Sequence, residues 1–371
     1  MTNIQTEIIR ILIQYSDLQS SQIHKHLTES GISLSLITAK REVKALLQAE
    51  FIEKRGSGRY VKYSISIKGK VFATIDSQKY TSIDPDLRYG QSKYNFELFE
   101  GFPTVVITEQ ELAKLEEATN NFYVKSKNIS PIIEKKELER LVIELSWKSS
   151  KIEGNTYTLL DTERLILENV EANGHTKDET QMILNHKKAF DYIWEHRKAF
   201  KSVSKAVVET VHSLLTDNLE IRKGYRKTGV GVNGSIYKPL DNTYQIEDAM
   251  DSLFGLIGRV NNPYDQALIA LAGISYIQPF EDGNKRTSRL VANSILIGHD
   301  LAPLSYRSVD IDHYRSAMLT FYELNSSMPL KGIFINQYIE SANNYLLRSV
   351  IPRAIAQGCK PTPKGARSVA I

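Results

Sequence analysis

The feature that most constrains this chain is a short polar segment between two apolar stretches. It runs from Ile277 to Arg289 and reads IQPFEDGNKRTSR. Residues 264–276 before it and residues 290–297 after it carry apolar side chains at helical spacing. Pro279 indicates that the first helix stops near Gln278, because proline disfavours a helical residue before it. The segment therefore predicts a sharp polar turn between two buried helices.

The start of the second of these helices is rich in positive charge. Gly283 and Asn284 open it, and Lys285, Arg286 and Arg289 fall in its first turn and a half. A helix N-terminus already carries partial positive charge and unpaired N–H groups. Three cations at this place are stabilised when an anion lies among them, so the pattern predicts a polyphosphate site.

Asp282 directly precedes this helix start. Its carboxylate is well placed to hold Mg²⁺ against bound phosphates, because hard oxygen ligands suit this ion. The alternative is a solvated basic helix start that follows an ordinary turn.

From Pro279 to Arg289 the segment resembles the active-site motif of the Fic family, HPFx(D/E)GN(G/K)RxxR. This family is mostly α-helical, and its best-known members transfer AMP from Mg-ATP to a hydroxyl of a target protein. The resemblance implies a nucleotidyltransferase with ATP and Mg²⁺ as cofactors and a Tyr, Thr or Ser hydroxyl as acceptor. It implies a metal-binding and catalytic role for Asp282 and a catalytic role for Arg286. It also implies an ATP-binding set: Phe280, Gly283, Asn284, Lys285, Arg286 and Arg289.

One position departs from the family motif. The family's catalytic base is a histidine, and Gln278 stands in its place. An imidazole accepts a proton near neutral pH, whereas an amide can only orient a partner by hydrogen bonding. Since the loss of one general base costs on the order of 10²- to 10⁴-fold in rate, we expect nucleotide binding with poor AMP transfer. Gln278 is either natural, in a pseudo-enzyme, or an engineered change, and the intact remainder of the motif favours the engineered change.

A second position separates two branches of the family. Lys285 stands where many members have glycine, and the Doc branch also has lysine there. That likeness implies phosphoryl transfer with ATP bound the other way round. Arg289 is the second arginine of the AMP-transferring branch, which Doc-type sequences lack. Nucleotidyl transfer is therefore favoured, and a Doc-like phosphotransferase is the alternative.

A shorter motif ends the helix expected over about residues 135–155. Its residues SSKIEGN, from Ser149 through Glu153 and Gly154 to Asn155, match the family's inhibitory motif, S/T-x-x-x-E-G/N. The resemblance implies that Glu153 pairs with Arg289 at the position of the terminal phosphate. A carboxylate and a guanidinium can pair through two hydrogen bonds, so such a block is physically sound. Related proteins use this glutamate in removing AMP from a target, so transfer and removal both stay open.

Residues 224–239 differ in character from the helical sequence around them. They are rich in glycine and β-branched residues, and Asn233-Gly234 is a hairpin turn signal. The segment resembles the family's flap, a β-hairpin that would register a target segment by strand addition. An ordinary surface hairpin is the alternative. The flap residues expected to meet the target are Val232, Asn233, Gly234, Ile236 and Tyr237.

The first 70 residues look like a separate small domain. Helical patterns are followed by two β-like runs, 51–55 and 60–67, which resembles a winged helix-turn-helix fold. These residues hold 11 Lys and Arg against 6 Asp and Glu, a net charge of +5 in a chain whose net charge is +4. A basic face suits phosphate contacts. The DNA-binding residues would be Lys40, Arg41, Lys44 and Arg59.

This domain leaves a second function open. The chain could be a DNA-binding transcriptional regulator whose Fic-like core only senses nucleotide, or the domain could bind protein. The whole is expected to be mainly α: an all-helical Fic-type core with a β-hairpin flap and a small N-terminal winged-helix domain. The expected limits are 1–70 for this domain, 71–125 for an ordered connector, 126–347 for the core and 348–371 for a basic tail.

The remaining composition bears on location. The single cysteine, Cys359, excludes an intramolecular disulfide and fits a reducing compartment. No stretch approaches the ~20 apolar residues of a membrane span, and no signal peptide is recognised, so a cytoplasmic location is expected. The sequence leaves open whether the chain forms a homodimer, and it does not specify the target protein.

Overall fold

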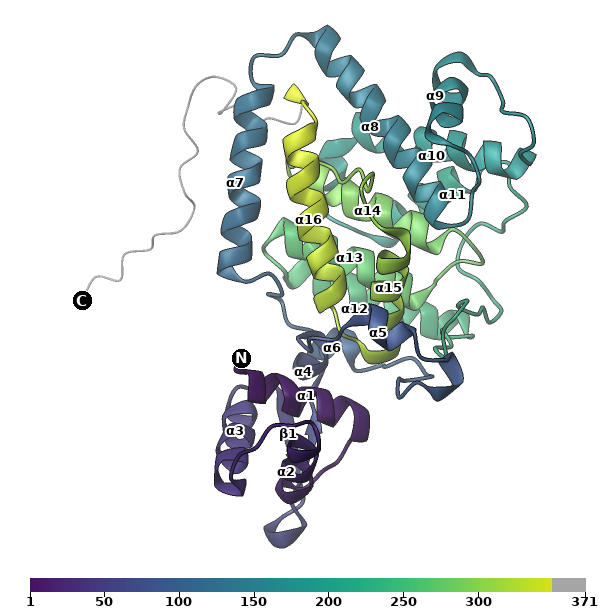
Figure 1. Ribbon diagram of the computed structural model, residues 1–371. Helices are drawn as coiled ribbons and strands as arrows, with labels where there is room; N and C mark the ends of the chain where they lie inside the picture. The colour runs from purple at the N-terminus through teal and green to yellow at the C-terminus, as the bar shows by residue number, and fades with distance from the viewer. Residues whose placement is uncertain (349–371) are drawn as a thin grey trace.

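The computed structural model describes residues 1–348, and helices dominate it (Figure 1). The predicted mainly α fold class is confirmed. The N-terminal part consists of α1 (Asn3–Tyr15), α2 (Ser20–Glu29), α3 (Leu36–Gln48), β1 (Ile52–Arg55) and β2 (Lys62–Ile65). The two strands are antiparallel and pair Ile52 with Ile65.

Local sequence explains how this part begins and packs. Thr2 caps α1: its side chain accepts from the N–H of Gln5, whose side chain accepts from the N–H of Thr2. The apolar residues of α1 then fall on one buried face against α2 and α3. Leu324, from the far end of the sequence, lies in the same hydrophobic cluster. The N-terminal part is therefore packed onto the rest of the molecule.

Short helices connect this part to the larger body. They are α4 (Ile67–Val71), α5 (Ser77–Thr81), α6 (Leu98–Gly101) and then the longer α7 (Glu109–Ser126). Buried residues of α6 and α7 belong to the main hydrophobic core, and α7 lies beside α16 (Met328–Asn344) (Figure 1). The connector is thus built into the fold, while the predicted domain limits stay a prediction.

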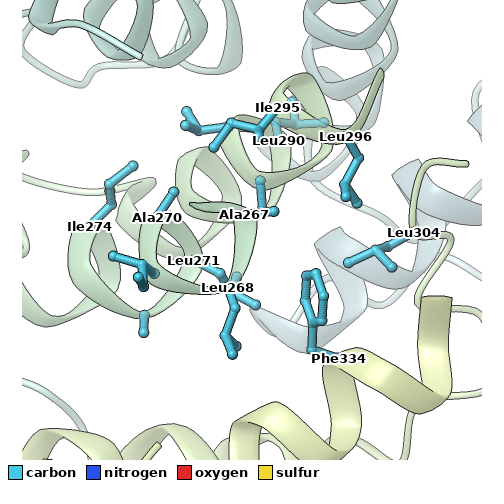
Figure 2. Packing of buried hydrophobic residues seen from close by; sticks show 14 of the residues in the cluster. Ala267, Leu268, Ala270, Leu271, Ile274, Leu290, Ile295, Leu296, Leu304 and Phe334 are labelled. Atoms are coloured by element: carbon cyan, nitrogen blue, oxygen red, sulfur yellow. The ribbon is translucent and has the colours of Figure 1, made fainter. Parts of the chain in front are cut away.

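The main body is built around two successive helices. They are α13 (Pro263–Ile277) and α14 (Asn284–Gly298), and Figure 2 shows their side chains packed with Phe334 of α16. Almost every residue of α13 is buried, as expected for a helix that is apolar all round. Around them lie α8 (Pro131–Ile152), α9 (Leu159–Glu168), α10 (Lys177–Glu195), α11 (Lys205–Leu215), α12 (Thr243–Arg259) and α15 (Ile311–Leu324).

The prediction of a β-hairpin flap is wrong, because the segment does not form two paired strands. In the described chain no strand lies between Gly224 and Pro239. Only the turn forms, where the N–H of Ser235 donates to Val232 at 3.2 Å and Gly234 has φ +74°. Other backbone groups of the segment bond to distant parts of the chain, so they are not available for a two-stranded ladder. For example, the N–H of Lys238 donates to the carbonyl of Ser92 at 3.0 Å. We call residues 228–236 the flap loop.

None of the helices in residues 1–348 is long and apolar enough to cross a membrane. The predicted basic tail, apart from its first residue, and Cys359 lie outside the described residues.

Candidate active site

The turn after α13 holds the backbone of Gln278 in an uncommon conformation. Gln278 has φ +52° and ψ +59°, and its N–H donates to the carbonyl of Ile274 at 3.1 Å. The buried Arg226 donates from Nε to the carbonyl of Gln278 at 2.7 Å. The Gln278 side chain donates from Nε2 to the carbonyl of Ser275 at 2.6 Å. The main chain at this position is therefore fixed by contacts that do not involve the side chain.

The next residues form a closed loop that aims α14. The Asn284 side chain accepts from the N–H of Phe280 and donates to its carbonyl, both at 2.8 Å. Gly283 follows with φ +78°, a left-handed conformation that favours glycine, and occupies the N-cap of α14. These two hydrogen bonds of the Asn284 side chain thus orient the positive N-terminal end of α14 towards the space in front of the loop.

Phe280 anchors this loop to the interior of the protein. Its ring is fully buried and stacks on the His212 ring of α11, with centroids 3.6 Å apart. His212 donates from Nε2 to the carbonyl of Asp282 at 3.1 Å. Burial lowers the pKa of His212 to about 4, so the imidazole is neutral at neutral pH. Phe280 was predicted among the phosphate-binding residues, and its full burial corrects this: it anchors the loop.

Arg286 brings an incompletely paired charge to the loop. Its side chain is 1 % exposed, and Nη2 donates to Oδ2 of Asp282 at 3.0 Å. Within the described part of the chain, its buried Nε and Nη1 have no hydrogen-bond partner. Burial lowers the pKa of Arg286, which reflects the cost of keeping this cation away from water. Such a group is stabilised when an anion is bound next to it.

Arg289 lies one turn further along α14 and is paired with the end of α8. Its Nε donates to the Ser149 hydroxyl and its Nη2 to the Ser149 carbonyl, each at 2.9 Å. Nη2 also donates to Oε1 of Glu153 at 2.9 Å, while Lys285 lies 3.6 Å from Oε2 of Glu153. Burial raises the pKa of Glu153, but Arg289 and Lys285 outweigh this effect and hold it below its usual value. Glu153 is therefore ionised at neutral pH.

The sequence after Glu153 fixes this arrangement. Gly154 has φ +101°, which suits glycine at the end of a helix. Asn155 is buried and donates from its side chain to the carbonyl of Glu179 on α10 at 2.8 Å. The end of α8 is thereby tied to α10, and Glu153 is held next to α14.

Two cavities adjoin these charges. One, of about 260 Å³, is lined by the loop and the start of α14, and the other, of about 290 Å³, by α15 residues that include Tyr314 and Tyr322. The two cavities share four lining residues: Glu153, Val232, Asn233 and Lys285. Glu153 thus stands between a polar cavity and a partly apolar one.

The flap loop covers one side of these cavities. Val232 and Asn233 line both of them, and Ile236 is partly buried. Tyr237 was predicted to meet a target, but it is 1 % exposed. Its hydroxyl donates to the carbonyl of Tyr276 at 2.9 Å, and the two rings stack. Tyr237 is therefore an anchor beneath the loop.

Comparisons with known proteins identify the family to which part of the chain is similar. Residues 202–296, which contain α11 to most of α14, match the model of the Fic/DOC family. The chain contains a Fic/DOC family domain. It is 26 % identical over 217 residues to a protein adenylyltransferase Fic of Nematostella vectensis, covering 57 % of this chain and 50 % of that protein. It is 27 % identical over 161 residues to a protein of the same name from Drosophila willistoni, and this match covers 43 % of this chain and 32 % of that protein. The chain thus spans half or less of the length of these curated relatives.

Solved structures show the same fold. A Fic domain containing signaling protein of Bacteroides thetaiotaomicron superposes with a TM-score of 0.54 at 17 % identity, covering 68 % of this chain and all of that one. A Fic family protein of Desulfovibrio desulfuricans superposes with a TM-score of 0.54 at 20 % identity. This superposition covers 71 % of this chain and 79 % of that one.

Asp282 offers a carboxylate that could bind a magnesium ion. Its side chain is 66 % exposed and uses Oδ2 for Arg286. Among residues 1–348, no group of three His, Cys, Asp or Glu side chains could hold a metal. Mg²⁺ commonly takes one or two carboxylates together with substrate phosphates and water. The donor set therefore fits an ion that arrives with a nucleotide.

Sequence reasoning missed Arg226 and Met182. Arg226 supports the backbone at position 278, and Met182 of α10 lines the polar cavity. No local signal marks either residue, because each is brought to the site by tertiary contacts. His186 and His212 are both buried.

Proposed function

We propose that the Fic/DOC domain is a protein adenylyltransferase that binds Mg-ATP in the paired cavities. In this reading it transfers AMP to a Tyr, Thr or Ser hydroxyl of a target protein. The observation that carries the proposal is the buried Arg286, whose Nε and Nη1 have no partner within residues 1–348 and lie beside the positive end of α14. The name of the curated relatives, protein adenylyltransferase Fic, supports the choice of reaction.

Each charged residue has a role in this proposal. Arg286, Lys285 and the first N–H groups of α14 bind phosphate oxygens, and Arg289 binds the terminal phosphate once Glu153 moves away. Asp282 would hold Mg²⁺, which lowers the negative charge of the phosphates when it is bound. The apolar side chains of the second cavity suit a purine base.

The transfer step explains the importance of position 278. The acceptor oxygen forms a bond to the α-phosphorus, the bond from that phosphorus to the bridging oxygen breaks, and pyrophosphate leaves. The acceptor's proton must pass to a base. Gln278 cannot take it, because an amide is not basic at neutral pH, so the chain with Gln278 is expected to be almost inactive.

Glu153 supplies a second restraint. Its carboxylate pairs with Arg289 at 2.9 Å and lies 3.6 Å from Lys285. This carboxylate offsets one of the two positive charges without a nucleotide, so the terminal phosphate must compete with a carboxylate that the chain itself provides. This proposed autoinhibition predicts tighter nucleotide binding when Glu153 is replaced.

Labelled ATP tests the reaction directly. We would incubate the chain, Gln278→His, Glu153→Gly and the double variant with Mg²⁺ and ATP labelled at the α-phosphate. Protein-bound label is expected mainly in the double variant. Its absence there, with nucleotide binding intact, contradicts the adenylyltransferase and favours a nucleotide-sensing regulator. Label that reaches protein only from γ-labelled ATP identifies the Doc-like phosphotransferase.

We infer a second function, DNA binding, for the N-terminal part. Lys40, Arg41 and Lys44 are exposed on one face of α3, and Arg59 is exposed between the two strands. Their spacing of three and four residues places the α3 cations side by side. This cationic face supports contacts to DNA phosphates.

Salt dependence tests this second function. The affinity for a mixed-sequence duplex should fall with salt, and Lys44→Ala should reduce the log–log slope by about 0.9 if it contacts one phosphate. Lys136→Ala, on an exposed part of α8, is the control. Equal slopes for the two variants, or no binding by the parent chain, contradict DNA binding by α3.

A further inference from the structure

The flap loop is held by a buried acid from a distant helix. Glu323, in the last turn of α15, is fully buried. Its Oε1 accepts from the Ser235 hydroxyl at 2.6 Å and from Nη1 of Arg88 at 3.1 Å. Its Oε2 accepts from the Tyr80 hydroxyl at 2.7 Å. The carboxylate thus joins the flap loop to the connector between the N-terminal part and the core.

Arg88 bonds to the same loop directly. Its Nη1 donates to the carbonyl of Gly234 at 2.9 Å, and its side chain is 4 % exposed. Its Nε and Nη2 donate to the carbonyls of Ile83 and Thr81, at 2.9 and 2.8 Å. The connector therefore holds the Arg88 guanidinium in place, and the guanidinium holds the tight turn of the flap loop.

Ser235 completes the network on the loop side. Its hydroxyl donates to Glu323 and accepts from the N–H of Tyr237 at 3.1 Å. One hydroxyl therefore links the acid to the anchor residue of the loop. Val232 and Asn233, which line both cavities, lie three and two residues before it, respectively. A shift at Ser235 would consequently change the cavity wall.

Gly90 shows how closely the connector approaches Glu323. A Cβ atom at Gly90 would lie 2.5 Å from the Tyr80 hydroxyl and 2.7 Å from Cβ of Glu323. The N–H of Gln91 donates to the carbonyl of Glu323 at 2.7 Å. Since only glycine fits there, the arrangement leaves little freedom to move.

We propose that Glu323 is a positioning residue, which acts through Ser235 and Arg88 to hold the flap loop in the place where an acceptor hydroxyl must enter. The inference rests on the proposed function for the identity of that acceptor, but the placement of the loop itself does not. Glu323 touches neither cavity that borders α14, so its effect on the reaction is indirect. The connector thereby supports the acceptor site from outside the cavities.

Amide hydrogen exchange of the full chain tests the placement. Ser235→Ala removes one charge-assisted hydrogen bond and should increase exchange of residues 228–236 by roughly tenfold. Ser235→Thr keeps the hydroxyl and should restore slow exchange. Ser308→Ala is the matched control, because it removes a serine-to-glutamate bond, to Glu340, away from the loop. Unchanged exchange in Ser235→Ala overturns the proposal.

Glu323→Gln gives a stronger perturbation, because it removes the charge that Arg88 faces. Exchange in the flap loop should rise further than in Ser235→Ala. If this variant does not fold, Gly90→Ala replaces it, since the added Cβ must displace Glu323 or Tyr80. Slow exchange in the loop of either folded variant contradicts the proposal.

A kinetic split tests the consequence for catalysis. In the chain with Glu153→Gly and Gln278→His, a random Glu-Tyr copolymer serves as the hydroxyl acceptor. Ser235→Ala should raise the KM for the copolymer several-fold and the KM for Mg-ATP less, because Val232 and Asn233 form only part of the cavity wall. Faster exchange with an unchanged acceptor KM overturns the positioning role. No transfer by the parent double variant refutes the proposed function, and the exchange experiment then still decides the placement of the loop.

Discussion

Two buried histidines have protonation states that burial determines. His212 of α11 and His186 of α10 are both buried behind the site. Burial lowers the pKa of His212 to about 4 and that of His186 to about 3. The ordinary pKa of a histidine is near 6.5, so the unfolded chain binds more protons than the folded chain between about pH 4 and 6.5. Acid in this window therefore favours unfolding.

The free energy of unfolding should fall as the pH is lowered from 6.5 towards 4. Each histidine contributes up to about 1.4 kcal/mol per pH unit. His212→Gln removes one contribution and should reduce the slope accordingly. Urea unfolding at pH 7, 6 and 5 measures it, with His313→Gln, on the exposed side of α15, as control. An unchanged slope in His212→Gln would show that this imidazole is not kept neutral by the fold.

Among the elements, the turn between α13 and α14 depends on one side chain. Asn284 makes both bonds that close the loop to Phe280. The same device occurs on α14 at Asn293, which accepts from the N–H of Leu304 and donates to its carbonyl, at 2.7 and 3.0 Å. The two asparagines are thus matched in chemistry, and only Asn284 borders the polar cavity.

Asn284→Ala and Asn293→Ala should each destabilise the chain by about 1–3 kcal/mol, because each leaves two buried backbone groups unpaired. Only Asn284→Ala should also weaken binding of Mg-ATP, since it releases the start of α14. Urea unfolding and calorimetric titration in the Glu153→Gly background separate the two effects. Equal nucleotide affinity in both variants would show that the loop does not need this closure.

The same elements show what the sequence could predict. The turn at Pro279 and the helix opened by Gly283 followed from local sequence, and the pairing of Glu153 with Arg289 followed from the family resemblance. The structure has all three features. The flap was predicted as a hairpin from its composition. Its strands do not form, because Lys238 and Arg226 bond outside the segment. The roles of Arg226 and Glu323 depend on contacts over long sequence distances, which local patterns do not encode.

For the molecule as a whole, one junction links the N-terminal part to the core. Leu324, at the end of α15, and Tyr80, on α5, lie in the hydrophobic cluster formed by α1, α2 and α3. Glu323 is the residue before Leu324 and holds the flap loop. Figure 1 shows α5 between the N-terminal helices and the body that contains the site. The N-terminal part and the flap loop are therefore supported by adjacent residues of one helix.

Leu324→Ala should destabilise the packing of the N-terminal part by about 2–5 kcal/mol, since Leu324 is buried in that cluster. Hydrogen exchange is expected to increase in α1 to α3. Leu304→Ala removes an equally buried leucine from the main core and serves as control, without a selective increase in α1 to α3. The same exchange pattern in both variants would argue against a specific junction.

The backbone at position 278 has a consequence at the level of the gene. Arg226 and Ile274 hold its main chain through its own carbonyl and N–H, and histidine is among the residues enriched in left-handed conformations. Glutamine and histidine codons differ only in their third base. A single nucleotide change can therefore exchange an inert residue for a basic one in a fold that is already prepared for it. Under the proposed function, one mutational step separates loss of the general base from its recovery, while the restraint by Glu153 stays in place.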